Sequence, residues 1–260
     1  MNLPNPIAFS LFGLEVRWYG ILIATGMMLG LLLTMKRANK SKKLVQDDII
    51  DIFLWMLPAA ILGARLYYVI FEWEYYAHNP SEILAIWHGG MAIHGGILAG
   101  ILAAFIVCSA KKINFFEMAD LIMPGLALGQ AIGRWGNFFN QEAHGVETTL
   151  PWAITVNDPI MGLVQVHPTF LYESIWNLLV MIGLLLYDKY KKKVEGELLA
   201  LYFIFYSIGR FFIEGLRTDS LMFFGLRTAQ CISLVMILLG MLGFWLLRHQ
   251  KTNNFKKNKK

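Results

Sequence analysis

The stretch of the chain that runs from Gly129 to Gly145, GQAIGRWGNFFNQEAHG, concentrates polar side chains at the end of an apolar segment. Its polar residues are Gln130, Arg134, Asn137, Asn140, Gln141, Glu142 and His144. Glycines this dense let backbone approach backbone, or a ligand, closely. A charged residue at membrane depth is costly and indicates a functional site. The alternative interpretation is a polar helix end followed by a glycine-rich turn.

A second polar group lies in ALYFIFYSIGRFFIEGLRTD, where Tyr206, Arg210, Glu214 and Arg217 follow a helical spacing. That spacing places the four side chains on one face of a helix. Arg210 and Glu214 alone would be an ordinary ion pair within a helix. The whole stripe favours the wall of a polar cavity.

Two histidines occur in the doubled motif WHGGMAIHGG. His88 and His94 are too far apart in sequence to share a helix face as a zinc pair does. No cysteine or aspartate joins them, so we predict no metal site. His94 lies deeper in the apolar run, between small residues, and a general base is its natural role. A structural histidine with satisfied hydrogen bonds is the alternative.

Two further polar residues come from the motifs RWYG and HPTFLYES. Tyr19 is expected at the outer membrane interface, where a place in the aromatic belt would also explain it. Glu173 is expected to face into the membrane. The sequence contains no nucleotide-binding glycine loop, no Ser-His-Asp order and no metal cluster. What remains is a cavity of arginines, a histidine, tyrosines and glutamates, with no cofactor.

The elements that must position these residues are membrane helices. Of the 260 residues, 57% are hydrophobic and only 16% are charged, which is typical of an all-α integral membrane protein. Apolar runs of about 20 residues are long enough to cross a bilayer. We predict spans over 18–35, 49–71, 92–110, 115–134, 168–187, 197–214 and 228–247. Residues 1–247 would then form one seven-helix catalytic domain, with 248–260 as a basic tail.

The lysines predict the orientation of these spans. All of them fall in four segments, 36–43, 111–112, 189–193 and 251–260. Seven spans place all four segments on the same side, which the positive-inside rule identifies as the cytoplasm. The N-terminus is therefore expected outside and the C-terminus inside. Residues 135–167 become the longest outward loop, a small extracytoplasmic cap with some strand character, and 72–87 suits an interfacial segment.

Six arginines are distributed in the opposite way, in the outer halves of spans or in outward segments. They are Arg17, Arg65, Arg134, Arg210, Arg217 and Arg227. Arginine without lysine favours bidentate recognition of a carboxylate or a phosphate. Internal ion pairs with Glu142, Glu173 or Glu214 are the competing explanation. We expect both uses, with some arginines structural and others on a ligand.

GRWGNFFNQEAHG resembles the signature of the bacterial prolipoprotein diacylglyceryl transferases. RWYG, WHGGMAIHGG, HPTFLYES and YSIGRFFIEGLR resemble further blocks of that family, in family order, from about 17 to 230. The resemblance implies a multi-pass protein of the bacterial cytoplasmic membrane with seven helices. It implies an enzyme that moves the diacylglyceryl group of phosphatidylglycerol onto the lipobox cysteine of a prolipoprotein and releases glycerol phosphate. Its partners would be membrane lipids and precursor signal peptides, not nucleic acid.

The resemblance also assigns roles to residues, motif by motif. It implies that Arg134 and Arg210 are essential and that His94 and Tyr19 are important. It places further residues in the substrate site, namely Asn137, Glu142, Gly145, Glu173, Tyr206, Glu214 and Arg217. The surroundings of Glu142 vary in the family, so no role is carried over to His144.

The implied chemistry suits these residue types. A thiol must attack a glycerol carbon while a phosphate ester leaves, and arginines can neutralise the charge on the departing phosphate. A free thiol needs a base or a positive field to form the thiolate. The alternative function is a lipid or anion transporter with an arginine-lined site, although no internal duplication supports it. A structural membrane scaffold comes third and leaves the clustered arginines unexplained.

Overall fold

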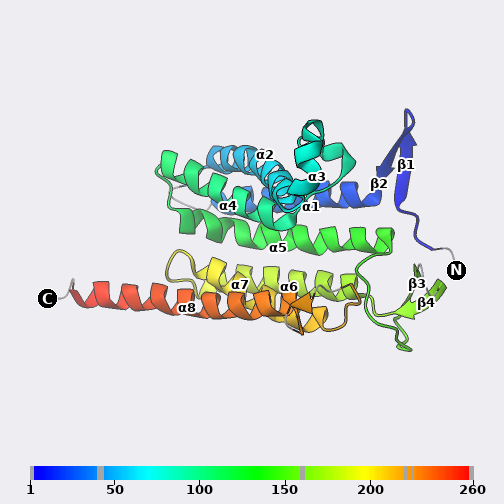
Figure 1. The fold of residues 1–260 in the computed structure, drawn as a ribbon. Helices are drawn as coiled ribbons and strands as arrows, with labels where there is room; N and C mark the ends of the chain where they lie inside the picture. The colour runs from blue at the N-terminus through cyan, green and yellow to red at the C-terminus, as the bar shows by residue number, and fades with distance from the viewer. Residues whose placement is uncertain (1–2, 40–43, 159–161, 220–221, 224, 258–260) are drawn as a thin grey trace. The chain divides into compact units, whose positions relative to one another are not determined.

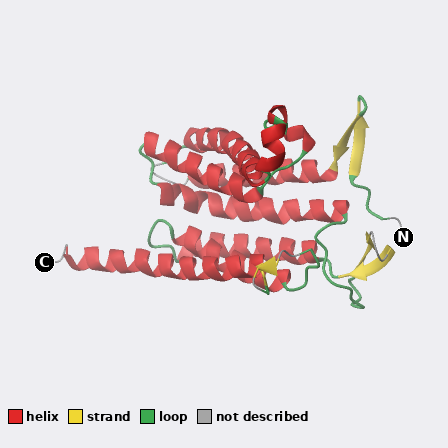
Figure 2. Ribbon diagram, viewed as in Figure 1, coloured by secondary structure: helices red, strands yellow, loops and turns green. Residues whose placement is uncertain are grey.

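The computed structural model describes residues 3–39, 44–158, 162–219, 222–223 and 225–257. This described part is mostly helical, with three short two-stranded sheets (Figure 2). Six of its helices are long and apolar enough to cross a membrane, judged by length and composition. The coarse prediction of a helical membrane protein is therefore confirmed.

Those six helices coincide with six of the seven predicted spans. They are α1 (Trp18–Ala38), α2 (Gln46–Phe71), α4 (Ile93–Ala110), α5 (Phe115–Asn140), α6 (Thr169–Tyr190) and α8 (Thr228–Lys257). The seventh predicted span is also a helix, α7 (Glu197–Glu214). Its 18 residues contain three charged side chains, Glu197, Arg210 and Glu214, so its composition alone does not mark it as a span.

The shorter elements precede the first of these helices or connect them. α3 (Trp73–His78) and the 3-10 turns η1 (Pro80–Glu82) and η2 (Ile86–His88) occupy the segment expected at the interface. The antiparallel pairs are β1 (Ile7–Leu11) with β2 (Leu14–Arg17), β3 (Ile154–Asp158) with β4 (Gly162–Val166), and β5 (Met222–Phe223) with β6 (Leu226–Arg227). The β3–β4 hairpin confirms the strand character predicted for the cap. The β1–β2 hairpin was not predicted.

Two predicted boundaries are wrong. α8 continues to Lys257, into the segment 248–260 that was predicted as a basic tail. The loop expected to begin at residue 135 begins only after Asn140, because α5 continues to that residue. The added turns are held by aromatic packing against α6. The Phe170 ring lies 5.3 Å from that of Trp135 and 5.0 Å from that of Phe138, between ring centroids. Trp135 Nε1 also donates a hydrogen bond to Ser174 Oγ at 3.2 Å.

The chain divides into two compact units, residues 1–34 with 119–260, and residues 35–118. We call them the first and second unit and describe each by itself. The boundaries fall inside α1 and α5. The prediction of a single catalytic domain over residues 1–247 stays a prediction.

In the first unit, α6, α7 and α8 lie side by side (Figure 1). A core shared by α5, α6 and α7 consists of Met123, Ala127, Val180, Leu184, Leu198 and Tyr202. The middle of α1 packs on α5 through glycines. A Cβ on Gly26 would lie 2.8 Å from the Gly129 carbonyl oxygen, and one on Gly30 would lie 2.6 Å from that of Gly125. This close approach explains the first glycine of the GQAIGRWG motif.

An ion network joins α5 to the turn between α6 and α7. Asp120, fully buried on α5, accepts hydrogen bonds from the Gly196 and Leu199 amides at 2.8 and 3.0 Å, at the start of α7. Lys192 Nζ lies 3.0 Å from the same carboxylate. Burial opposes the charge on Lys192, but its hydrogen bonds to Glu195 and Asp120 outweigh burial and raise its pKa. The network fixes the N-terminal end of α7, which is the end far from Arg210.

Candidate active site

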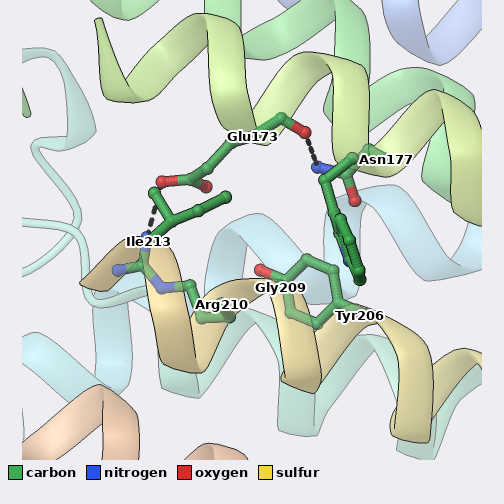
Figure 3. Close-up of a pocket in the computed structure, with 7 residues that line it drawn as sticks. Glu173, Asn177, Tyr206, Gly209, Arg210 and Ile213 are labelled. Atoms are coloured by element: carbon green, nitrogen blue, oxygen red, sulfur yellow. Dashed lines mark hydrogen bonds and ion pairs between the residues drawn. The ribbon is translucent and has the colours of Figure 1, made fainter. Parts of the chain in front are cut away.

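Glu173 on α6 holds two arginines that come from two other helices. Its side chain is only 4% exposed. Oε2 lies 2.7 Å from Nε of Arg134 on α5, and Oε1 lies 2.8 Å from Nη1 of Arg210 on α7. Figure 3 shows the Glu173 carboxylate directed at the Arg210 guanidinium. A buried carboxylate with two charged partners fixes both guanidinium groups in one place.

The predicted stripe on α7 contributes a second carboxylate. Nη2 of Arg210 lies 2.6 Å from Oε2 of Glu214. Arg217, just past the helix end, lies 3.8 Å from the same oxygen and 3.6 Å from Oε1 of Glu173. The expected ion pairs on Glu173 and Glu214 are therefore present, and three arginines share two buried carboxylates.

Asp219 completes the cluster, and sequence reasoning missed it. Arg217 binds it through two nitrogens, with Nε to Oδ1 at 3.0 Å and Nη2 to Oδ2 at 2.7 Å. Burial alone would raise the pKa of the Asp219 carboxyl, but the hydrogen bonds and charge of Arg217 outweigh burial and lower it. The Arg-Thr-Asp spacing was a local signal that could have revealed this pair.

A small cavity lies beside the Glu173–Arg210 pair, between α6 and α7 (Figure 3). It is lined by Glu173, Trp176, Asn177, Tyr206, Gly209, Arg210 and Ile213. Asn177 donates from Nδ2 to the Glu173 carbonyl at 2.9 Å. Trp176 lies over Gly209, where any Cβ would collide with the indole. Sequence reasoning missed both residues, although Asn177 stands one helical turn after Glu173.

Tyr206, the first residue of the predicted stripe, packs against Tyr202, which lies one turn earlier on α7. Its ring stacks on that of Tyr202, with centroids 5.4 Å apart and planes at 16°. The Tyr202 hydroxyl donates to Oε1 of Gln130 on α5 at 2.9 Å. Tyr206 also lies close enough to Arg134 to interact with its charge. The glutamine of the signature motif thus supports the arginine cluster through two tyrosines.

The end of α5 carries the next two predicted residues. Glu142 Oε1 accepts hydrogen bonds from Nδ2 of Asn137 at 3.0 Å and of Asn140 at 3.2 Å. Glu142 was expected to be a possible ion-pair partner for an arginine. In the described residues it has amide partners instead.

Gly145 and Tyr19 each lie in a closely packed contact. Gly145 pairs with Arg217 in an isolated β-bridge, and a Cβ on it would lie 2.7 Å from the Cβ of His167. The Tyr19 ring lies against Gly136 on α5, where a Cβ would lie 2.5 Å from Cδ2 of the tyrosine. Glycines are therefore required at both positions.

The second unit contains His94, the second residue of α4. Its ring is exposed and contacts that of Tyr67, at 6.4 Å between centroids. His88 instead has a carboxylate partner, with Nδ1 2.6 Å from Oε2 of Glu82. Arg65, also in this unit, is 1% exposed, and within the described part of the chain its hydrogen bonds go to backbone carbonyls. It fulfils the expectation that some of the six arginines are structural.

Comparison with known proteins identifies the family. The model of the prolipoprotein diacylglyceryl transferase family matches residues 6–246. This chain belongs to that family. A phosphatidylglycerol–prolipoprotein diacylglyceryl transferase of Clostridioides difficile is 51% identical over 248 residues, which are 95% of this chain and 97% of the relative.

Two more relatives with the same name match this chain over nearly its whole length. The Finegoldia magna protein is 49% identical over 236 residues, 91% of this chain and 93% of its own. The Clostridium novyi protein is 51% identical over 243 residues, with shares of 92% and 94%. The family match therefore includes α5, α6 and α7, which carry the arginine cluster.

Proposed function

We propose that this chain transfers the diacylglyceryl group of phosphatidylglycerol to the lipobox cysteine of prolipoproteins, forming a thioether and releasing glycerol phosphate. The names of its relatives support this activity. The structural observation that carries the proposal is the convergence of Arg134 and Arg210 on the buried carboxylate of Glu173. Such a cluster suits a phosphate whose negative charge increases during the reaction.

In the proposed reaction the thiolate sulfur attacks the carbon of the diacylated glycerol that bears the phosphate. A C–S bond forms, the C–O bond breaks, and its electron pair leaves on the phosphate oxygen. Arg134 and Arg210 neutralise that charge from positions that Glu173 has already fixed, so little reorganisation is needed. The lipid carries its own leaving group, and the proposal therefore requires no cofactor.

The remaining predicted residues have supporting roles in this proposal. Tyr206 and Arg217 complete the wall around the phosphate, and Glu214 orients Arg210. Tyr19 and Gly145 shape the site through their close packing. His94 is proposed to accept the proton of the cysteine thiol, a role that suits imidazole near neutral pH.

We further propose that α7 is a seventh span and that the N-terminus is outside a bacterial cytoplasmic membrane. The charges on α7 are compatible with a span because Glu197 and Glu214 are buried in the protein and Arg210 is paired. Intramembrane charges normally face the protein interior in this way. The sorting of the lysines supports the orientation, and the prolipoprotein cysteine would then meet the site on the outer side.

The test is incubation of the purified protein with phosphatidylglycerol micelles and a synthetic lipobox peptide. Mass spectrometry should show the peptide gaining one diacylglyceryl group, while a matched peptide with serine in place of cysteine stays unmodified. An unmodified cysteine peptide, together with movement of lipid or anion across proteoliposomes, would contradict the proposal and favour the transporter.

A further inference from the structure

The last turn of α5 folds Glu142 back onto its own helix. The Gln141 amide donates to the Phe138 carbonyl at 3.2 Å, and the Glu142 amide donates to the Asn137 carbonyl at 3.1 Å. This is the Schellman pattern, in which the residue past the helix end takes a left-handed conformation and is usually glycine. Here it is Gln141, with φ of 53°. A side chain in that conformation costs free energy, which other contacts must offset.

The Gln141 side chain supplies those contacts. Its Oε1 accepts a hydrogen bond from the Asn157 amide at 3.1 Å, and its Nε2 donates to the Pro4 carbonyl at 3.3 Å. The turn is thus anchored on two sides. The position of Glu142 beside the helix is a built feature of the fold, not a fraying helix end.

The carboxylate of Glu142 is oriented within this turn. Both amide donors, from Asn137 and Asn140, bind the same oxygen, Oε1. Among the residues that the structure describes, Oε2 receives no hydrogen bond, and Glu142 is exposed. These two hydrogen bonds also determine the orientation of both asparagine amide groups, because each Nδ2 must face the carboxylate. Oδ1 of Asn140 is buried and has no partner in the described chain.

The helical spacing on α5 relates this acceptor to the proposed phosphate site through Asn137. Asn137 follows Arg134 by three residues on α5, so the two side chains are neighbours on the helix surface. Three residues rise about 4.5 Å along the helix, which is comparable to the few bonds between a phosphate and the hydroxyls of a glycerol headgroup. A phosphate on Arg134 would therefore bring those hydroxyl donors within reach of an oriented carboxylate.

We propose that Glu142, held by Asn137 and Asn140, accepts hydrogen bonds from the glycerol hydroxyls of the lipid headgroup and so selects lipids that carry them. The inference rests on the proposed function. Asn140 is then a positioning residue that acts through Glu142, and it is a determinant of headgroup specificity. Gln141 supports the turn without touching the headgroup.

The experiment compares two donor lipids of equal charge in the same micelles. Phosphatidylglycerol carries both headgroup hydroxyls, whereas phosphatidylpropanol has the same phosphate and neither hydroxyl. We expect the parent enzyme to prefer phosphatidylglycerol by roughly 10- to 100-fold in kcat/KM, since a hydrogen bond to a charged group has about that effect. The ratio of the two rates is measured on one preparation, so it does not depend on the folded fraction.

Variants then test which residues cause the preference for phosphatidylglycerol. Glu142→Ala should reduce the ratio toward one, mainly by slowing transfer from phosphatidylglycerol. Asn140→Ala should lower the ratio several-fold, because one of the two donors that orient the carboxylate is lost. Gln141→Gly is the matched control, since glycine adopts the left-handed conformation readily. It should keep the parental ratio.

The outcomes separate this inference from the proposed function. A parent enzyme that prefers phosphatidylglycerol, with the preference lost at Glu142 and reduced at Asn140, supports the inference. Variants that slow both lipids by the same factor, or a parent that uses both lipids equally, contradict the inference while the transferase activity stands. A parent enzyme that lipidates no peptide with either lipid contradicts the proposed function, and this inference falls with it.

Discussion

Two regions of this protein hold arginine side chains largely out of solvent, and they do so in different ways. In the second unit, Arg65 donates from Nε to the Ile83 carbonyl at 2.9 Å and from Nη2 to the Glu82 carbonyl at 2.5 Å. Its Nη1 donates to the Gly89 and Gly90 carbonyls at 2.5 and 2.9 Å. The acceptors of Arg65 are therefore neutral backbone groups of its own unit.

In the first unit the arginines meet carboxylates instead. Arg134, Arg210 and Arg217 all contact Glu173, and the last two also contact Glu214. Each guanidinium is a multiple donor without an acceptor. With Asp219 included, the three guanidinium groups face three carboxylates, so the cluster has no formal net charge. What it offers a further anion is the N–H donors that these ion pairs do not use. Low exposure alone therefore does not distinguish these two kinds of arginine, whereas their partners do.

The largest effect is expected in the first unit. Arg134→Ala and Arg210→Ala should each lower kcat for peptide lipidation about 10²–10³-fold, as loss of one electrostatic stabiliser does. Lysine replacements should recover little, because the planar fork is lost. The measurement is the initial rate at saturating phosphatidylglycerol, normalised to folded protein by size-exclusion chromatography.

The control for this prediction is Arg17→Ala. Arg17 is exposed and lies 3.9 Å from Glu15, so its removal should change the rate by no more than about threefold. Near-parental rates for both lysine variants would show that bidentate recognition of a phosphate is wrong.

Much of the difference between Arg65 and the arginines of the first unit could not be predicted from the sequence. The helices α1, α2, α4, α5, α6 and α8 could be predicted because long apolar runs have one solution in a bilayer. The Arg210–Glu214 contact followed from helical spacing. Arg65, however, was grouped with the other outer arginines. Its distinction depends on carbonyls of Gly89 and Gly90, whose φ angles of 84° and 72° direct the turn toward it.

The unpredicted parts of the site share one physical cause, which is contact between distant segments. The extension of α5 to Asn140 depends on Phe170 of α6. The left-handed Gln141 depends on Asn157 and Pro4, and no local propensity favours glutamine in that conformation. Patterns of period 3.6 report which face a residue occupies, but not which partner it finds there.

A smaller but substantial effect is expected in the second unit, and it concerns stability. Arg65→Met should lower the free energy of unfolding by about 3 kcal/mol, since buried carbonyls left without a donor cost about 1–3 kcal/mol each and some will recruit water. Arg210→Ala should cost less, because Glu173 keeps Arg134 and Glu214 keeps Arg217. Thermal unfolding in detergent, followed by tryptophan fluorescence, measures both. Equal losses of stability would contradict the distinction between the two regions.

The smallest effect is expected at the rim of the cluster, at Asp219. The Asp219 side chain is 50% exposed, so its bidentate bond to Arg217 is screened by solvent and should contribute no more than about 1 kcal/mol. Asp219→Asn should therefore lower kcat/KM for phosphatidylglycerol by at most about fivefold, through a less well ordered Arg217.

The pH dependence of that contribution has a definite sign. Because Arg217 lowers the pKa of the Asp219 carboxyl in the folded protein, the stabilisation is present above the unfolded pKa of about 3.9 and is lost as the pH falls through the lower folded value. Between pH 6 and pH 8 the ratio of parent to Asp219→Asn rates should consequently stay constant. A ratio that changes across this range would show that Asp219 exchanges a proton during turnover, and Arg217 would then belong with the reacting groups and not with the wall that surrounds them.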